Sequence, residues 1–173
     1  LDMSGIAKGQ AVDELVLLME ASGCSRYLVD IGGEIKAGCS NLKEKSWRIG
    51  VEKPSLDMGQ GLVSVLLLQD MGIATSGDYR NFRLSGGKKV SHIIDPRSGE
   101  PVKNGVISVT VADKSTMRAD ALATAFMVMG EEESIAFAEE NDIPVFLIRK
   151  KSTGEVIERY TSAMTSLFLM DPD

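Results

Sequence analysis

The stretch RADALATAF, residues 118–126, combines an acid and a hydroxyl at the spacing of one helical turn. Residues four positions apart on a helix face the same side, with Cβ atoms about 5–6 Å apart, so oxygens of Asp120 and Thr124 could meet. Mg²⁺ takes oxygen ligands at about 2.1 Å and needs only one or two protein carboxylates. A structural role fits equally, with Asp120 near a helix N-terminus and Thr124 bonded to a carbonyl one turn earlier. The pair therefore indicates either a metal site or a stabilised helix.

Two further polar stretches could bind or process a phosphate. ATSGDYRNF, residues 74–82, places Ser76 and Gly77 at the end of a strand, close to an arginine. This composition suits a polar turn, and it also suits hydroxyl and backbone contacts to a ligand phosphate. SHIIDPRSGEPV, residues 91–102, carries the single histidine of the chain, His92. Histidine side chains titrate near neutrality, so His92 is a candidate acid–base group as well as a structural hydrogen bonder.

Several common functional patterns are absent from the sequence. SGIAKGQ lacks the Gly-Lys-Ser/Thr of a phosphate loop, and the IGG pair lacks the third glycine of a dinucleotide fingerprint. No Gly-x-Ser-x-Gly elbow occurs, and Cys24, Cys39 and one histidine do not make a zinc pattern. The two cysteines fit either free thiols or one disulfide. A net charge of -6 without a basic stripe argues against a nucleic-acid partner.

The hydrophobic pattern distributes these residues over helices and strands. Val12, Leu15, Val16 and Met19 have the spacing of an amphipathic helix over residues 6–21, and Gly23 suits its end. The other expected helices are residues 116–129 and 132–141, and the expected strands are residues 26–31, 35–39, 47–51, 62–69, 72–76, 81–85, 88–94, 106–112, 144–150 and 156–164. The apolar run at 62–68 is far too short to span a bilayer.

Strands outnumber helices in this pattern and do not alternate with them one for one. Gly86-Gly87 and the segment 152–154 read as hairpin turns, and residues 26–51 read as meandering antiparallel strands. We therefore expect an α+β fold with a mostly antiparallel sheet and a few packed helices. Composition is typical of a globular protein, with 43% hydrophobic and 25% charged residues, and no linker or repeat is evident. A single domain over residues 1–173 is expected.

Six motifs taken together resemble the ApbE family, the thiamine biosynthesis lipoproteins that are FAD:protein FMN transferases. The motifs are SGIAKGQAVD, YLVDIGGEI, ATSGDYRNF, SHIIDPRSGEPV, SVTV and ADALATAFMVMG, and they occur in the family's order over about residues 2–147. The resemblance implies Mg²⁺-dependent transfer of FMN from FAD to a threonine or serine hydroxyl of an acceptor protein, with release of AMP. Two alternatives are an FAD pyrophosphatase, which uses water as the acceptor, and a non-catalytic FAD-binding protein.

The resemblance also assigns roles to residues, motif by motif. It implies that Asp120, Thr124 and backbone oxygens of Ala7 and Ala123 hold the metal. It implies that the flavin nucleotide site is lined by Lys8, Gly33, Glu34, Ser76, Gly77, His92 and Ile93. Phosphoryl transfer rests mainly on positioning and charge neutralisation, and a hydroxyl acceptor benefits from a base, which makes His92 the candidate catalytic residue.

Family members carry on the order of a hundred further residues before SGIAKG, including a signal or lipobox. The chain begins at Leu1, already beside the first motif, so we expect it to be truncated at its N-terminus. By resemblance, the intact protein would be periplasmic or a membrane-anchored lipoprotein, with any membrane contact made through that missing anchor. An open site loses burial and preorganisation, so the fragment is expected to bind FAD weakly or not at all.

Overall fold

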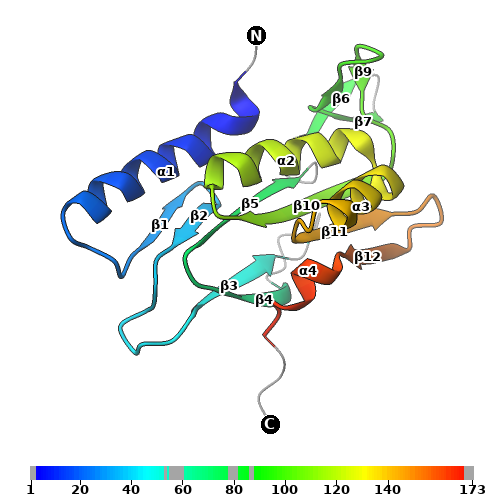
Figure 1. Cartoon of the computed structure of the whole chain (residues 1–173). Helices are drawn as coiled ribbons and strands as arrows, with labels where there is room; N and C mark the ends of the chain where they lie inside the picture. Colours follow the sequence, from blue (N-terminus) through cyan, green and yellow to red (C-terminus); the bar gives the residue numbers. More distant parts are fainter. Residues whose placement is uncertain (1–2, 53, 55–60, 78–81, 86–87, 170–173) are drawn as a thin grey trace.

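The computed structural model describes residues 3–52, 54, 61–77, 82–85 and 88–169 (Figure 1). Within these residues, six antiparallel strands form a central sheet in the order β1-β2-β5-β10-β11-β12. The strands are β1 (Leu28–Ile31), β2 (Glu34–Ala37), β5 (Met71–Gly77), β10 (Val106–Asp113), β11 (Val145–Lys150) and β12 (Val156–Tyr160). This arrangement confirms the expected α+β class with a mostly antiparallel sheet.

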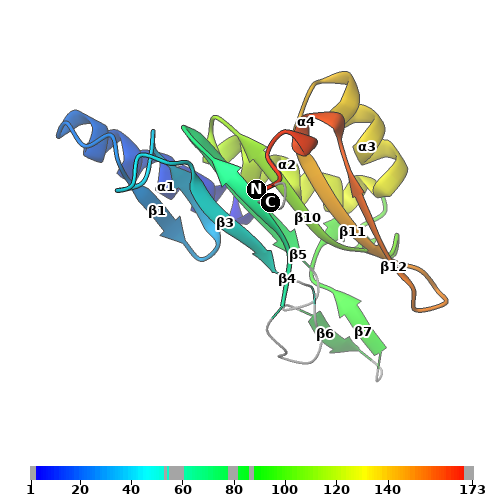
Figure 2. The same ribbon diagram turned by 90° about the horizontal axis from the view of Figure 1, so that it is seen from below.

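The central sheet is covered on both faces. Helices α1 (Ser4–Ala21), α2 (Thr116–Met129) and α3 (Glu131–Glu140) lie on one face, and α1 runs alongside α2 (Figure 1). The opposite face carries the antiparallel pair β3 (Trp47–Glu52) and β4 (Leu62–Leu68), together with the short helix α4 (Ser162–Thr165) (Figure 2). Gly130, with φ of 90°, separates α2 from α3 as the sequence predicts.

Two hydrophobic cores result from this layering. On the helix face, Ala74 and Leu147 pack with Phe126 of α2. On the other face, their sequence neighbours Ile73 and Phe146 pack with β3, β4 and α4. Successive side chains of a strand point to opposite faces, so a strand with two covered faces must be apolar at every position. That requirement explains the unbroken run VFLI in β11 and keeps the central strands rigid beneath α2.

Three of the expected strands differ from the structure, and the first two are residues 47–51 and 88–94. Residues 47–51 do not continue the meander of β1 and β2, because β3 pairs with β4 in a separate sheet. The expected strand 88–94 is wrong beyond β7 (Lys88–Ser91): the Ser91 hydroxyl accepts from the Ile93 N–H at 3.1 Å and turns the chain. Ile94 instead begins β8 (Ile94–Asp95), which pairs with β9 (Glu100–Pro101). β7 does pair with β6 (Phe82–Ser85), while the expected Gly86-Gly87 turn between them lies outside the described residues.

The last expected strand, 156–164, is also wrong in its second half. β12 ends at Tyr160, and α4 begins at Ser162. Between them Thr161 is fully buried, and its hydroxyl donates to the Ile143 carbonyl at 2.8 Å and accepts from the Val145 N–H at 3.0 Å. These bonds tie the end of β12 to the start of β11, so the chain leaves the sheet at this point.

Replacing Thr161 with valine is therefore expected to lower the free energy of unfolding by about 2 kcal/mol, because it leaves a buried donor and a buried acceptor unpaired. Urea denaturation measures this loss. The matched control is Thr165→Val, since Thr165 is exposed and makes one long hydroxyl bond of 3.4 Å. If both variants lose the same small amount, Thr161 does not have the role assigned here.

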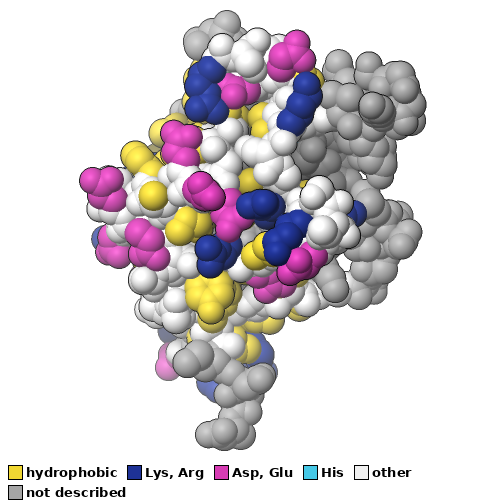
Figure 3. Space-filling model, turned by 90° about the vertical axis from the view of Figure 1, so that its right-hand side faces the viewer, with side chains coloured by type: hydrophobic (Ala, Val, Ile, Leu, Met, Phe, Trp, Pro, Cys, Tyr) yellow, Lys and Arg dark blue, Asp and Glu magenta, His cyan; other side chains and the backbone are white. Residues whose placement is uncertain are grey.

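Charges on the face formed by α3, β11 and β12 are mixed in sign, as Figure 3 shows, with basic and acidic groups side by side. The Glu131 carboxylate forms ion pairs with Arg149 Nη1 at 2.7 Å and with Arg159 Nε at 2.9 Å. Burial alone would raise the pKa of Glu131, but the two guanidinium groups outweigh it and lower the pKa. Lys151 and Glu155 form a further pair at 2.9 Å. Arg149, Arg159 and Lys151 are therefore engaged by neighbouring acids.

Two composition-based expectations are settled within the described residues. Cys24 and Cys39 are free thiols, which decides between the two alternatives left open by the sequence. None of the described helices is long and apolar enough to cross a membrane.

Candidate functional site

A cleft of about 1210 Å³ opens between the N-terminal end of α1, the β1–β2 turn, β3, the end of β5 and α2. Nine of the predicted site residues line it: Lys8, Gly33, Glu34, Ser76, Gly77, His92, Ile93, Asp120 and Thr124. The other two, Ala7 and Ala123, lie outside the lining, and their predicted contribution is a backbone oxygen. Five motifs, with residues up to 116 positions apart in sequence, therefore meet at one place.

The contact between α1 and α2 forms the floor of the cleft. The backbone N–H of Gly9 donates to Asp120 Oδ2 at 2.9 Å. One turn earlier on α1, a Cβ added to Gly5 would lie 3.0 Å from Thr124 Oγ1. One turn later, Asp13 accepts hydrogen bonds from the start of α2. We call these three points of contact the α1–α2 seam; they recur at four-residue spacing on both helices, which places residues 120 and 124 at a fixed height beside α1.

Asp120 is a buried carboxylate. It is 3% exposed, and burial raises its pKa above the ordinary value, against the opposing effects of the Gly9 N–H and the charge of Lys8. A buried carboxylate favours a nearby cation because an uncompensated charge in a low-dielectric surrounding is costly. This environment supports the metal interpretation of Asp120 over a helix-start role, since Asp120 bonds to α1 and not to the first turn of its own helix.

Glu34 supplies a second buried carboxylate at the edge of the cleft. It is 2% exposed and pairs with Lys8 Nζ at 2.5 Å. Burial raises the pKa of Glu34, the Lys8 ammonium opposes that rise, and the charge of Asp120 adds to it. Two acids thus share one ammonium, which leaves this corner of the cleft with one negative charge in excess when both are ionised.

Hydroxyl groups complete the polar wall. Ser76 Oγ, near the end of β5, lies 3.1 Å from Thr124 Oγ1 on α2. Gly33, with φ of 100°, donates its N–H to Asp30 Oδ1 at 2.9 Å and shapes the β1–β2 turn beside Lys8. His92 lies exposed on the lining of the cleft, between β7 and β8, while Ile93 beside it is buried.

The oxygen set fits a hard cation of the Mg²⁺ type. In the described part of the chain, no group of three His, Cys, Asp or Glu side chains forms a self-sufficient metal cage. Mg²⁺ does not require such a cage, because it keeps several waters and is completed by substrate phosphates. A buried carboxylate and a hydroxyl one turn further along the helix are side chains of the kind that such a site needs from the protein.

Sequence reasoning missed several residues of this region. Arg48 and Glu52 of β3 line the cleft, and β3 was expected to belong to another part of the sheet. Asp13 and Gly5 were read only as parts of a motif, yet both belong to the α1–α2 seam. The repeat Gly5, Gly9, Asp13 at four-residue spacing is the signal that could have revealed a face of α1 in close contact with another helix.

Replacing Lys8 with methionine is expected to lower the free energy of unfolding by about 2 kcal/mol at neutral pH, because Glu34 then lacks its counter-charge; half-exposure of Lys8 keeps the loss moderate. Because the pKa of Glu34 is raised in the folded state, folding favours the protonated acid. The contribution of Glu34 to the free energy of unfolding is therefore full below its ordinary pKa of 4.5 and is lost as the pH rises through the raised pKa. The variant should therefore lose stability more steeply with rising pH than the original chain.

Urea denaturation between about pH 4 and pH 8 measures this slope. Adding Glu34→Gln to Lys8→Met should remove the extra pH dependence, since the buried acid is gone. An unchanged slope in the double variant would show that another group is responsible.

Known proteins are similar to this chain over most of its length. The ApbE family model matches residues 1–147, so the chain belongs to the ApbE family. It is 47% identical over 169 residues to a FAD:protein FMN transferase of Vibrio cholerae, covering 98% of this chain and 50% of that protein. A protein of the same name from Haemophilus influenzae is 39% identical over 156 residues, covering 90% of this chain and 45% of that protein.

Solved structures show the same fold. The flavin transferase ApbE from Vibrio cholerae superposes with a TM-score of 0.84 at 45% identity, covering 96% of this chain and 52% of that one. The apo form of the Pseudomonas stutzeri flavinyl transferase ApbE gives 0.83 at 42% identity, covering 97% of this chain and 51% of that one. The chain therefore spans about half the length of the relatives it matches.

Proposed function

We propose that this protein is a Mg²⁺-dependent flavin transferase that moves FMN from FAD to a threonine or serine hydroxyl of an acceptor protein and releases AMP. The observation that carries the proposal is the convergence of Asp120, Thr124, Ser76, Lys8 and His92 on one cleft. Family membership supports the same reaction, since relatives at up to 47% identity are named FAD:protein FMN transferases.

Each residue has a separate task in this reaction. Asp120 and Thr124, with backbone oxygens of Ala7 and Ala123, would hold Mg²⁺, which when bound neutralises charge on the pyrophosphate. Lys8, held by Glu34 at 2.5 Å, places a second positive charge in the same corner. Phosphoryl transfer needs little beyond positioning and charge neutralisation, so a small number of well-fixed groups is sufficient.

The transfer breaks the phosphoanhydride bond of the FAD pyrophosphate and forms a phosphoester bond to the acceptor. The acceptor hydroxyl oxygen bonds to the phosphorus of the FMN half, the bridging P–O bond breaks, and AMP leaves with the bridging oxygen. The hydroxyl proton must pass to a base, and we assign this role to His92, which lies on the lining of the cleft. Ser76, whose Oγ lies 3.1 Å from Thr124 Oγ1, and the backbone of Gly77 would hydrogen-bond phosphate oxygens. The predicted location outside the cytoplasm rests on the family resemblance alone and stays a prediction.

An assay with FAD, Mg²⁺ and a threonine-bearing acceptor tests the proposal, using protein expressed from its full reading frame. We expect covalently attached FMN on the acceptor and one AMP per attachment, both lost when Mg²⁺ is chelated. AMP release at the same rate without acceptor would favour the pyrophosphatase alternative. Stoichiometric FAD binding with neither product would favour a non-catalytic flavin-binding protein.

A further inference from the structure

Asp13 of α1 makes three hydrogen bonds to the beginning of α2. Its carboxylate accepts from the Ser115 hydroxyl at 2.8 Å, the Thr116 N–H at 2.9 Å and the Met117 N–H at 3.0 Å. Ser115 in turn caps the third N–H of the helix, that of Arg118, at 3.2 Å. The first three N–H groups of α2 are thus satisfied, two of them by a residue from another helix.

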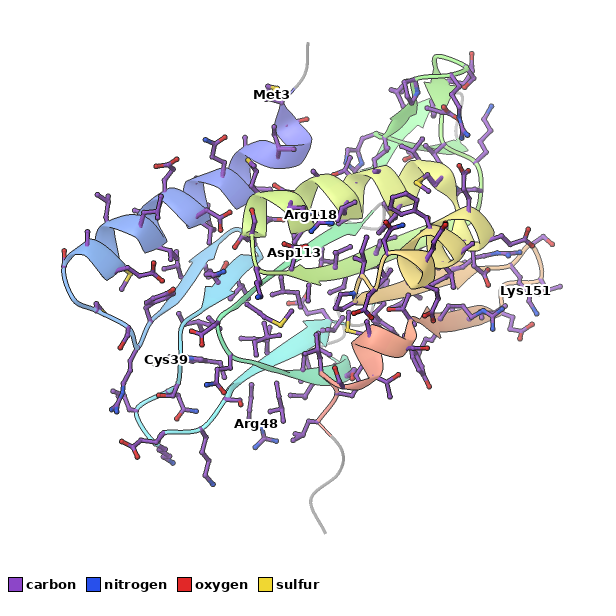
Figure 4. The ribbon with its side chains drawn as sticks, viewed as in Figure 1. Met3, Cys39, Arg48, Asp113, Arg118 and Lys151 are labelled. Atoms are coloured by element: carbon purple, nitrogen blue, oxygen red, sulfur yellow. The ribbon has the colours of Figure 1, made fainter. Side chains whose placement is uncertain are left out.

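A carboxylate is well suited to this position. The N-terminus of a helix carries partial positive charge, and α2 has no acidic residue of its own in its first turn. Burial by itself would raise the pKa of Asp13, but the hydrogen bonds from Met117, Thr116 and Ser115 outweigh it and lower the pKa. The Arg118 side chain does not reach Asp13 but forms an ion pair with Asp113 at 2.9 Å (Figure 4). Asp13 therefore supplies the carboxylate that accepts from the first N–H groups of α2, whereas Asp113 accepts from the Ser115 N–H before the helix at 2.9 Å.

The position of this cap matters for Asp120. Thr116, which Asp13 holds, and Asp120 are one helical turn apart, and Thr124 follows after another turn. The Gly9 N–H holds Asp120 through a single hydrogen bond. The close approach of Gly5 to Thr124 limits how far α2 can tilt toward α1, but it does not fix the position of α2 along the α1 axis. The three bonds of Asp13 are the strongest polar restraint in the α1–α2 seam on sliding of α2 along α1.

We propose that Asp13 is a positioning residue for the metal site, holding α2 at the position along α1 at which Asp120 accepts from the Gly9 N–H and Thr124 lies beside Gly5. Asp13 does not line the cleft, so it acts through the helix that it caps. The proposal rests on the proposed function, because it assumes that Asp120 and Thr124 hold a cation.

The test is direct binding of Mn²⁺, which favours the same octahedral oxygen ligands as Mg²⁺, followed by the electron paramagnetic resonance signal of free Mn²⁺ in the absence of FAD. Asp13→Asn should weaken Mn²⁺ affinity about tenfold, as loss of a supporting contact commonly does. Asp13→Glu should recover most of the affinity because it keeps the charge. All measurements are made at a temperature where circular dichroism shows each variant folded.

The matched control is Asn104→Ala, at the opposite end of the same helix. The Asn104 amide donates to the Met127 carbonyl at 2.9 Å and the Val128 carbonyl at 3.3 Å, so its loss also frees an end of α2. Asn104→Ala should lower the melting temperature and leave Mn²⁺ affinity within about twofold, since it lies away from the seam. If Asp13→Asn does not fold, Ser115→Ala removes one of the three bonds and should weaken Mn²⁺ binding about two- to threefold.

The outcomes separate two failures. If the original chain binds Mn²⁺ and Asp120→Asn abolishes binding, but Asp13→Asn or Ser115→Ala binds normally, the positioning role is wrong and the metal site stands. If Asn104→Ala weakens affinity as much as Asp13→Asn, Asp13 acts only through general stability, and the positioning role is again wrong. If Asp120→Asn binds Mn²⁺ like the original chain, the metal site of the proposed function fails as well.

Discussion

Replacing Asp120 with asparagine is expected to lower Mg²⁺-dependent AMP release from FAD by at least about 100-fold while leaving the protein as stable as before, or more stable. Asparagine keeps an oxygen for the Gly9 N–H, which donates to Asp120 Oδ2 at 2.9 Å, but it removes the charge that holds the cation. AMP release and the free energy of unfolding, measured on the same preparation, test both halves of this expectation.

The stability half follows from the sign of the pKa shift. Burial raises the pKa of Asp120, so the fold favours the neutral acid. Its contribution to stability is full below the ordinary value of 3.8 and is lost as pH rises through the raised value, which means that the ionised form carries a cost at neutral pH. Asparagine, which never ionises, removes that cost.

Glu131→Gln is the matched contrast, because it should show the opposite pattern. The pKa of Glu131 is lowered by Arg149 and Arg159, and the residue does not line the cleft. Its replacement should cost about 1 kcal/mol of stability and leave AMP release unchanged. If Asp120→Asn were instead destabilising and fully active, Asp120 would be a structural residue and not a metal ligand.

Replacing Gly9 with alanine is expected to have the largest effect on stability, a loss of about 3 kcal/mol. The added Cβ would lie 2.7 Å from the Met117 Cα and closer still to the Thr116 carbonyl oxygen, and both are backbone atoms that cannot turn aside. Alanine gains about 1 kcal/mol in helix propensity, which offsets only part of this cost. Thermal and urea denaturation measure the net loss.

Gln10→Ala provides the comparison at the next, exposed position of α1, where only propensity changes and stability should hold or rise slightly. A Gly9→Ala variant with full stability would mean that α1 and α2 are further apart than described. The α1–α2 seam would then not fix the height of Asp120.

Much of the fold could be predicted from the sequence because its strongest signals are local. The helical spacing of residues 6–21 and the breaks at Gly23 and Gly130 each depend on neighbouring residues alone. The pairing of β3 with β4 could not be predicted in this way, since strand partners are chosen by packing over a distant core. The exit of the chain from the sheet at Thr161 depends on its bonds to Ile143 and Val145, which no local pattern shows.

The site was predictable to a similar extent. The motif resemblance identified the residues of the cleft, and the structure brings nine of them together. It could not show why the glycines and the acid of SGIAKGQAVD are spaced by four. Gly9 and Asp13 become meaningful only when α2 lies against them, at 2.9 Å from Gly9 N to Asp120 and at 2.8 to 3.0 Å around Asp13.

The most direct test of the metal site is an anomalous difference map from crystals of the protein grown with Mn²⁺ and FAD. If Asp120 and Thr124 hold the metal, we expect one Mn²⁺ peak in the cleft, at about 2.2 Å from an Asp120 carboxylate oxygen and from the Thr124 hydroxyl. The FAD pyrophosphate should complete the coordination. A map with FAD bound and the Mn²⁺ peak on residues other than Asp120 and Thr124 would contradict it.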